Sequence, residues 1–268
     1  MAQAVHPASL SSSSFSSSRL VRYLSELAVS DVEVSHKNFA ERLGQMINLP
    51  DSLRLARVHW ELQDIELQDI EVEPLLMLPE QIRDEFLKGR NALIQSIIKS
   101  FLPDTASKRI RLPRPTAEMM REKILDFDPY RRFYSAHQTE MSYRVQDMQG
   151  RVREAASCLS PELAQLAILD KTFEKLLTHR AREFFAVVPK QLLRKRFDFL
   201  RQELRQEHQA RRTGTEQDDD PLAWVDPGGW LDKFYREMRE LLLAELEVRL
   251  QPVLGLIETL NVKEDINQ

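Results

Sequence analysis

Two short motifs in the sequence have the spacing of known metal sites. Glu33-Val34-Ser35-His36 is a Glu-x-x-His unit, and His59-Trp60-Glu61 has the His-x-Glu spacing of zinc deaminases. A helical di-iron site needs two Glu-x-x-His units and two further carboxylates, whereas the chain contains one such unit. A zinc deaminase also needs a Cys-x-x-Cys motif, and the chain has one cysteine. The sequence therefore predicts no metal site and no cofactor.

Two single side chains could also do chemistry. Cys158 is at a helix end among alanine and leucine residues, whereas a reactive thiol needs a base and an electropositive environment, so we interpret it as a packed structural thiol. His137 lies between Tyr134 and Met141 on an apolar helix face. A histidine there is usually a core residue with its hydrogen bonds made, and a ligand or pH-sensing role is the less common alternative. We predict no catalytic residues.

Long amphipathic helices must position these residues. Asp128 is expected to cap a helix with Pro129 at its first position. Its apolar positions advance 29 residues in eight steps, a mean of 3.63, which is the period of a straight helix and not of a coiled coil. Those positions are Tyr130, Tyr134, His137, Met141, Val145, Met148, Val152, Ala155 and Leu159.

The next two helices are expected on either side of Pro189. Ser160-Pro161 repeats the cap-and-proline signal and starts the first of them. We expect Pro189 to interrupt it, since proline lacks the backbone N–H, and a basic helix to follow. The first helix is predicted to bury Leu163, Leu166, Phe173, Leu177, Ala181 and Phe184, and the second Leu193, Phe197, Leu200 and Leu204.

The last helix has a second regular stripe. Its apolar positions also advance 29 residues in eight steps, and Pro252 inside it should bend it near Arg249. Both long stripes favour an all-α fold, an elongated helical bundle. The positions are Leu231, Phe234, Met238, Leu242, Leu246, Leu250, Val253, Ile257 and Leu260.

Composition divides the chain into segments. Residues 1–18 are a Ser-rich tail expected to be disordered, and residues 19–101 form an N-terminal helical region. That region contains an acidic segment, 61–80, with the tandem repeat Leu62-Gln-Asp-Ile-Glu66 and Leu67-Gln-Asp-Ile-Glu71; whether it is ordered stays open. The region ends in a helix that starts at Pro79 and buries Ile82, Phe86, Leu93, Ile97 and Phe101.

A Pro-rich basic linker, 102–116, leads to the helical bundle, 117–262. Thr116 is expected to cap a short helix that runs through Leu125. Within the bundle, an acidic linker spans residues 213–229 and carries five acids and no base.

The charges nearly cancel but are unevenly distributed. There are 38 Lys and Arg against 42 Asp and Glu, a net charge of −4, and no apolar run approaches the roughly 20 residues of a membrane span. With a single cysteine, a reducing, cytoplasmic location is expected. The helix 190–212 has eight bases and three acids. We interpret its face as a solvated surface or as a site for an acidic segment, either of a partner or of the chain's own acidic linker. Nucleic acid is the alternative ligand, which the acidic pI of 6.0 disfavours.

Arg131 and Arg132 are unusual because they lie in the first turn of a helix, where cations are disfavoured, so Asp126 or Asp128 should pair with them. The candidate interaction residues are Arg131, Arg132, His137, Lys190, Arg194, Lys195, Arg201, Arg205, Trp224 and Trp230.

Three blocks of the sequence carry a family resemblance: Phe39-Ala-Glu-Arg-Leu-Gly-Gln45, Asp128-Pro-Tyr-Arg-Arg-Phe-Tyr134 with His137-Gln138 and Glu140-Met141, and Leu250-Gln-Pro-Val-Leu-Gly-Leu-Ile-Glu258. They resemble an uncharacterised proteobacterial family, domain-of-unknown-function family thirty-three forty-eight. The family has no established activity, so the resemblance carries over no catalytic residue. It implies a gene cluster that also encodes an outer-membrane-protein-A-like protein and a membrane protein with a long helical cytoplasmic part.

The residues and their pattern predict a non-enzymatic helical interaction protein, and the resemblance implies a cytoplasmic accessory subunit of a bacterial, envelope-associated complex. Its expected partner is a protein, such as the helical cytoplasmic segment of an envelope membrane protein. One alternative is a nucleic-acid-binding protein that uses the basic helix 190–212. The second is an enzyme with an unrecognised site, suggested by His137 beside two tyrosines.

Overall fold

The computed structural model describes residues 53, 56–58, 60, 79–103, 109–122, 125–211 and 224–266. The predicted tail 1–18, the acidic repeat and residues 213–223 of the acidic linker lie outside these residues. So do both potential ligands of each motif with metal-ligand spacing, at positions 33 and 36 and at positions 59 and 61.

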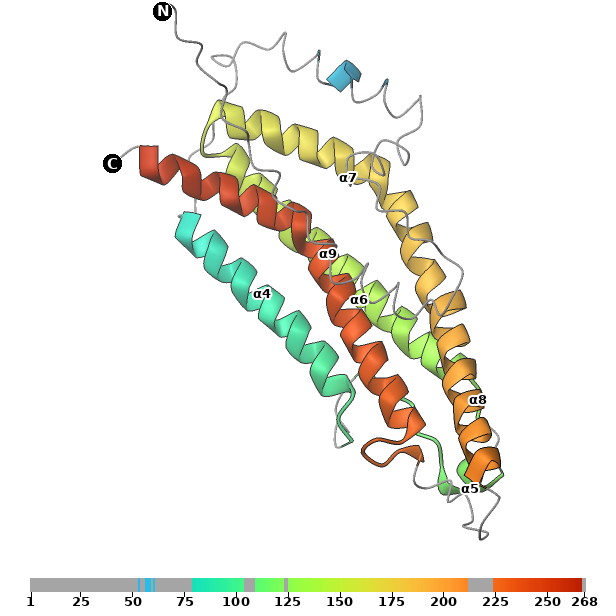
Figure 1. Cartoon of the computed structure of the whole chain (residues 1–268). Coiled ribbons are helices and arrows are strands. Elements are labelled where there is room, and N and C mark those ends of the chain that lie inside the picture. The colour runs from blue at the N-terminus through green and yellow to red at the C-terminus, as the bar shows by residue number, and fades with distance from the viewer. Residues whose placement is uncertain are drawn as a thin grey trace, which may run out of the picture.

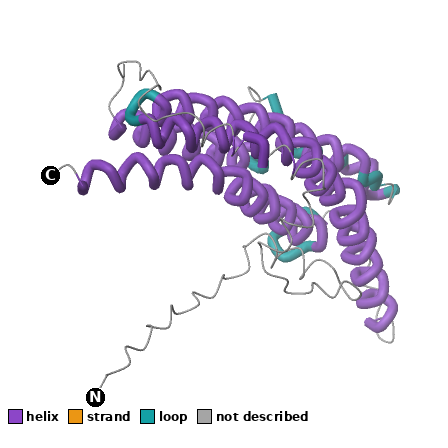
Figure 2. The backbone as a smooth tube through the Cα atoms, turned by 90° about the horizontal axis from the view of Figure 1, so that it is seen from above, coloured by secondary structure: helices purple, strands orange, loops and turns teal. Residues whose placement is uncertain are grey.

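The described residues form helices and no strand, which confirms the all-α prediction (Figure 1). Many of these helices are long, as the two predicted apolar stripes of about 30 residues required. Seen from above, they form an elongated bundle (Figure 2). The elements are α4 (Pro79–Ser100), α5 (Ala117–Arg121), α6 (Asp128–Ser157), α7 (Pro161–Val187), the π-turn η2 (Val188–Leu192), α8 (Leu193–Arg211) and α9 (Trp230–Ile266).

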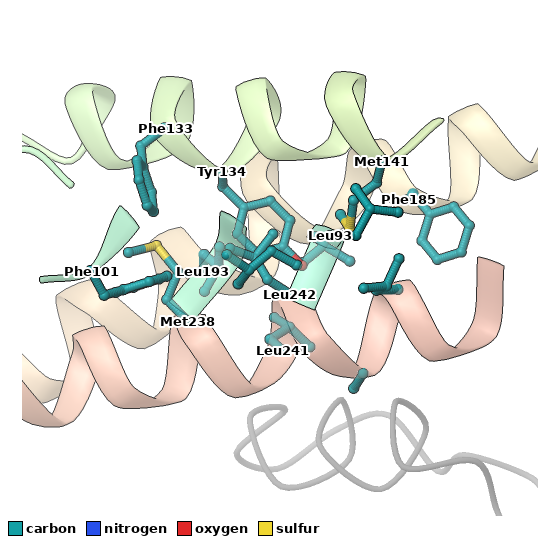
Figure 3. Close-up of a cluster of buried hydrophobic side chains, with 14 of the residues drawn as sticks. Leu93, Phe101, Phe133, Tyr134, Met141, Phe185, Leu193, Met238, Leu241 and Leu242 are labelled. Atoms are coloured by element: carbon teal, nitrogen blue, oxygen red, sulfur yellow. The ribbon is translucent and has the colours of Figure 1, made fainter. Parts of the chain in front are cut away.

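Helices α6 and α9 form the centre of the bundle. They pack along each other, α4 packs on both, α7 packs on α6, and α8 packs on α9. Gly89 allows α4 to approach α6 closely, because a Cβ there would lie 2.7 Å from the sulfur of Met148. The core fills the space between these helices with side chains such as Tyr134, Met141 and Leu242 (Figure 3). Helix α4 therefore shares one core with the predicted bundle.

The predicted buried stripes are confirmed on α4, α6 and α9. All nine positions predicted on α9 are buried, as are the five predicted from Pro79 onward. On α6, six of the nine are buried and Met148, Ala155 and Leu159 are partly buried against the core. Burial of each large apolar side chain contributes about 1.5–3 kcal/mol, so these stripes hold the bundle together.

Of three predicted helix ends, one is confirmed and two differ in part from the predictions. Ser160 caps α7 as predicted, and its Oγ accepts from Leu163 N–H. Asp128 does not cap α6, because the helix begins at Asp128 itself and Asp126 Oδ1 accepts from the Asp128 N–H. Thr116 caps α5, but the helix ends at Arg121 and not at Leu125.

On α7 the predicted inward face is partly wrong. Leu163 is buried, but Phe173 and Phe184 are 36% and 50% exposed, and Phe185 is buried in place of Phe184. The reason is that α7 turns Leu163, Ala167 and Phe185 toward the core, and these positions lie on a different side of the helix from Phe173. Pro189 does not break the chain into two separate helices: α7 continues through η2 into α8, with a bend visible in Figure 1.

Candidate interaction surface

The bend between α7 and α8 is fixed by a side chain of α6. Because Pro189 has no N–H, the carbonyl of Phe185, four residues earlier, lacks its regular helical donor. Gln138 Nε2 donates to this carbonyl at 2.9 Å, and the Val188 N–H also donates to it. The extra residue of the bend is accommodated by the π-turn η2. The bend is therefore held in place by hydrogen bonds.

Gln138 also joins a buried polar network centred on Glu245 of α9, which is 0% exposed. Its carboxylate accepts from Tyr134 Oη at 2.9 Å and from Gln138 Nε2 at 3.0 and 3.1 Å. Arg249 donates to the same carboxylate from Nη2 at 2.6 Å and from Nε at 2.9 Å. The buried charge is thus paired and fully hydrogen-bonded, the condition under which a buried carboxylate is tolerated.

Arg249 connects this network to the bend. Its Nη1 donates to Ser142 Oγ on α6 at 2.8 Å, and its guanidinium lies 4.0 Å from the centre of the Phe185 ring. Helices α6, α7 and α9 therefore meet at one polar cluster. The cluster fixes the place where the chain turns from α7 into α8.

Tyr134 is the hydroxyl donor of the network. It reaches from α6 toward α9 in Figure 3. Burial raises the pKa of the Tyr134 hydroxyl well above its usual value, and the negative charge of Glu245 raises it further. Tyr134 therefore stays protonated and donates to Glu245 at all ordinary pH values.

His137 is a core residue in this structure. It is 1% exposed, its Nε2 lies 2.9 Å from Ser100 Oγ at the end of α4, and its ring packs edge-on against Phe133. Ser100 Oγ also donates to Ile97 O at 2.7 Å, so the imidazole Nε2–H is the donor to Ser100. Burial lowers the pKa of His137 to about 4. A neutral, enclosed imidazole joins α4 to α6 here and does not face a partner.

Arg131 and Arg132 are paired, as the sequence predicted. Arg131 contacts Asp128 at 2.6 Å and Arg132 contacts it at 2.7 Å. The hydrogen bond from Arg131 and the two positive charges lower the pKa of the Asp128 carboxyl. The acid thus balances two cations in the first turn of α6, where they are otherwise disfavoured.

A row of exposed cations follows one flank of α7 and continues through η2 into α8. None of its members forms an ion pair among the described residues, whereas Arg131, Arg153 and Arg196 do. The spacings are 4, 7, 8 and 4 residues, and η2 supplies the extra residue in the step of 8. We name it the cationic strip: Lys171, Lys175, Arg182, Lys190 and Arg194.

The other predicted cations are placed differently. Lys195 is exposed on α8 beside the strip. Arg201 is partly buried, and its Nη1 reaches Leu125 O at 3.5 Å. Arg205 lies in α8, and its side chain is outside the described residues. Lys190, Arg194 and Lys195 are thus all exposed, within and just after the bend.

Trp224 and Trp230 do not lie on this surface. They are 7% and 6% exposed, their ring centres are 5.9 Å apart, and Trp230 packs edge-on against Phe197. Both tryptophans belong to the core at the start of α9.

A second exposed feature of α7 was not predicted from the sequence. Between Ala167 and Phe185, none of the described side chains is fully buried. Apolar side chains follow one flank of α7 from residue 169 to residue 187, a distance of five helical turns, with a gap between Leu176 and Phe184 in which the positions on this flank are Arg180 and Glu183. We name it the apolar flank: Leu169, Phe173, Leu176, Phe184 and Val187, of which Phe173, Phe184 and Val187 are exposed and the other two partly buried.

The two features lie on opposite flanks of α7. At about 100° per residue, the mean direction of the apolar flank is about 155° from that of Lys171, Lys175 and Arg182 around the helix axis. Different molecules can therefore occupy the two flanks at once.

A small cleft between α4 and α6, of about 170 Å³, contains charged side chains. Arg144 in its lining pairs with Glu140, and Arg151 pairs with Asp147 and Glu85. Its cations are thus already neutralised. Among the described residues, no cluster of three or more His, Cys, Asp or Glu side chains could hold a metal ion, and no helix is long and apolar enough to cross a bilayer.

Sequence reasoning missed Glu245 and Arg249. The available signal was their four-residue spacing within the apolar sequence of α9, next to the block that begins at Leu250. Gln138 was within a block that carried the family resemblance, but its role depends on Phe185, 47 residues away.

Comparison with known proteins identifies a family. The family model described as "Protein of unknown function (DUF3348)" matches residues 7–262, so its range includes the acidic repeat and part of the Ser-rich segment. No curated protein and no solved structure significantly matches the chain.

Proposed function

Because the chain belongs to the DUF3348 family, a family of unknown function, we propose a function from the geometry of its surface. It is a non-enzymatic helical interaction protein that binds an acidic segment of another protein along the cationic strip. The observation that carries the proposal is the row of cations from Lys171 to Arg194, which have no ion pair within the described part of the chain and continue across the Pro189 bend. The arginines of α6 and α9, in contrast, have acidic partners.

The titratable side chains of the interior support a structural role and not a catalytic one. A catalytic group must reach a substrate, whereas His137, Tyr134 and Glu245 are each at most 1% exposed and are hydrogen-bonded to one another's helices or to α4. Their bonds fix the relative positions of α4, α6, α7 and α9. A rigid scaffold of this kind suits the display of a surface.

For the setting, we propose a cytoplasmic accessory role in a bacterial, envelope-associated complex. The single cysteine supports a reducing compartment. The resemblance of the three sequence blocks supports the envelope association. An acidic helical segment on the cytoplasmic side of a membrane protein is the partner that suits the strip.

Affinity purification from the native host under mild lysis tests the proposal. We expect a stoichiometric protein partner that is lost when Lys171, Lys175 and Arg182 are all changed to Glu. The matched control changes Arg83, Lys88 and Lys99, exposed cations of α4, to Glu and alters the net charge equally. Recovery of the wild-type chain without any partner, or equal loss in both triple variants, would overturn the proposal.

A nucleic-acid interface on α8 is the second candidate function, favoured by exposed Lys190, Arg194 and Lys195. Phosphate binding by these cations should weaken steeply with salt. DNA or RNA binding assays between about 50 and 200 mM salt decide this. No binding at the low end of that range removes the candidate.

A further inference from the structure

We propose that the apolar flank of α7 is the contact surface between two copies of this chain, paired antiparallel about a two-fold axis. This interface is separate from the cationic strip and goes beyond the proposed function. The first observation is exposure: Phe173, Phe184 and Val187 are 36%, 50% and 39% exposed along one flank of a helix that otherwise packs on α6. Monomeric proteins seldom expose a contiguous row of large apolar side chains.

The spacing of the flank selects a second copy as its occupant. In an antiparallel pair of identical helices, facing residues have numbers with a constant sum. Leu169 and Val187 sum to 356, and Phe173 and Phe184 sum to 357. The two pairs therefore agree within one residue, or about 1.5 Å along the axis. A two-fold contact requires such a self-complementary surface, in which residue i meets j and j meets i.

Charge at the two ends of α7 favours the same arrangement. Exposed Glu162 lies in the first turn, on the side of the apolar flank, and the exposed cation Lys195, which is not part of the cationic strip, follows the other end of the helix. Antiparallel pairing brings Glu162 of one copy toward the basic end of the other, where parallel pairing would place like charges together. It also sets the helix dipoles antiparallel.

The size of the flank fits a specific helix pair. It extends over 18 residues, or about 27 Å. Helices that pack with i, i+3, i+4 and i+7 side chains bury a strip of this kind. The centre of the pair lies near residue 178, so the Leu176 side chains of the two copies, partly buried in each chain, flank the two-fold axis.

Disulfide trapping in the full chain tests the register. In a Cys158→Ser background, one protein carries Phe173→Cys and a second carries Phe184→Cys; both positions are exposed, so the variants should fold, which circular dichroism checks. We expect the mixture to form the 173–184 link at least tenfold more than either the 173–173 or the 184–184 link. Preference for the like pairs would overturn the antiparallel arrangement.

Sedimentation of the wild-type chain across protein concentrations tests the association itself. We expect a dimer that dissociates at least tenfold more readily in the double variant Phe173→Ser and Phe184→Ser. Tyr143→Ser, at a residue of α6 that is 75% exposed, is the control and should leave the dimer unchanged. A monomer at all concentrations, as expected if another segment of the chain covers the flank, would overturn the inference. The variant in which Lys171, Lys175 and Arg182 are changed to Glu should still dimerise, so the two proposals can fail separately.

Discussion

The side-chain amide of Gln138 donates a 2.9 Å hydrogen bond to the backbone carbonyl of Phe185, the carbonyl that Pro189 leaves without its regular helical donor. One side chain of α6 thus replaces a backbone bond of α7. Through the same nitrogen it also contacts Glu245 of α9. This contact helps to fix the direction in which the chain turns from α7 into α8, which packs on α9, and with it the course of the cationic strip.

Gln138→Leu should destabilise the fold. It removes a hydrogen bond to the Phe185 carbonyl, which keeps the Val188 N–H as a donor, and one to the charged Glu245 carboxylate. A hydrogen bond to a charged group contributes about 1.5–3 kcal/mol. Urea unfolding followed by circular dichroism measures this loss. The control is Gln146→Leu at an exposed position of the same helix, which should change the free energy of unfolding by less than about 0.5 kcal/mol. Equal effects of the two variants would contradict the role of Gln138.

Glu245→Ala should be the more damaging change, because it leaves the guanidinium of Arg249 buried without its partner. Breaking a buried ion pair in this way costs about 3–5 kcal/mol. Adding Arg249→Met to Glu245→Ala should recover part of the loss, since the unpaired charge is then removed. Glu258→Ala, at an exposed residue of α9, serves as the reference. A double variant less stable than Glu245→Ala alone would argue against a paired charge.

Stability should fall between about pH 6.5 and pH 4 because of His137. Its pKa is lowered from 6.5 to about 4 by burial, so in this range the unfolded chain binds a proton that the folded chain does not. The contribution of the neutral His137 to the free energy of unfolding is complete above pH 6.5 and fully lost below about pH 4.

The matched variant is His137→Gln, which does not titrate and can still donate to Ser100. From pH 7 to pH 4, wild type should lose up to about 3 kcal/mol of stability relative to it. Chemical denaturation at several pH values measures the difference. Exposed His179, changed to Gln, provides the control, and a pH-independent difference for His137→Gln would refute the assignment.

The neighbouring residues Phe184 and Phe185 should respond differently to truncation. Phe185 is 7% exposed and packs under Arg249, so Phe185→Ala should cost about 3–5 kcal/mol. Phe184 is 50% exposed, and at low protein concentration Phe184→Ala should cost less than about 1 kcal/mol. Thermal unfolding of the two variants in parallel makes the comparison. Similar losses would mean that α7 turns another face to the core.

The regular helices could be predicted from the sequence because their signals are local. The nine positions of the α9 stripe keep a helical period and all are buried. Ser160 followed by Pro161 marked the start of α7 correctly. Along α7 the local pattern is ambiguous, because Phe184 and Phe185 both belong to apolar series with helical spacing. Only the contact with α6 decides which one is buried.

The candidate site could be predicted only in part. The basic residues Lys190 and Arg194 were evident from charge, but Lys171 and Lys175 align with them only because η2 takes up one extra residue at the bend. The network at Glu245 could not be read from the sequence, since Tyr134 donates to it from 111 residues away. Pairings of this kind depend on how helices pack and leave no local pattern.

The most direct test of the proposed function is the dissociation constant of the complex recovered from the native host. Wild type is compared with the triple charge reversal of Lys171, Lys175 and Arg182, and with the matched reversal on α4. We predict binding at least tenfold weaker for the strip variant, nearly unchanged for the α4 variant, and weakened by salt for wild type. Equal dissociation constants for all three proteins would contradict the account.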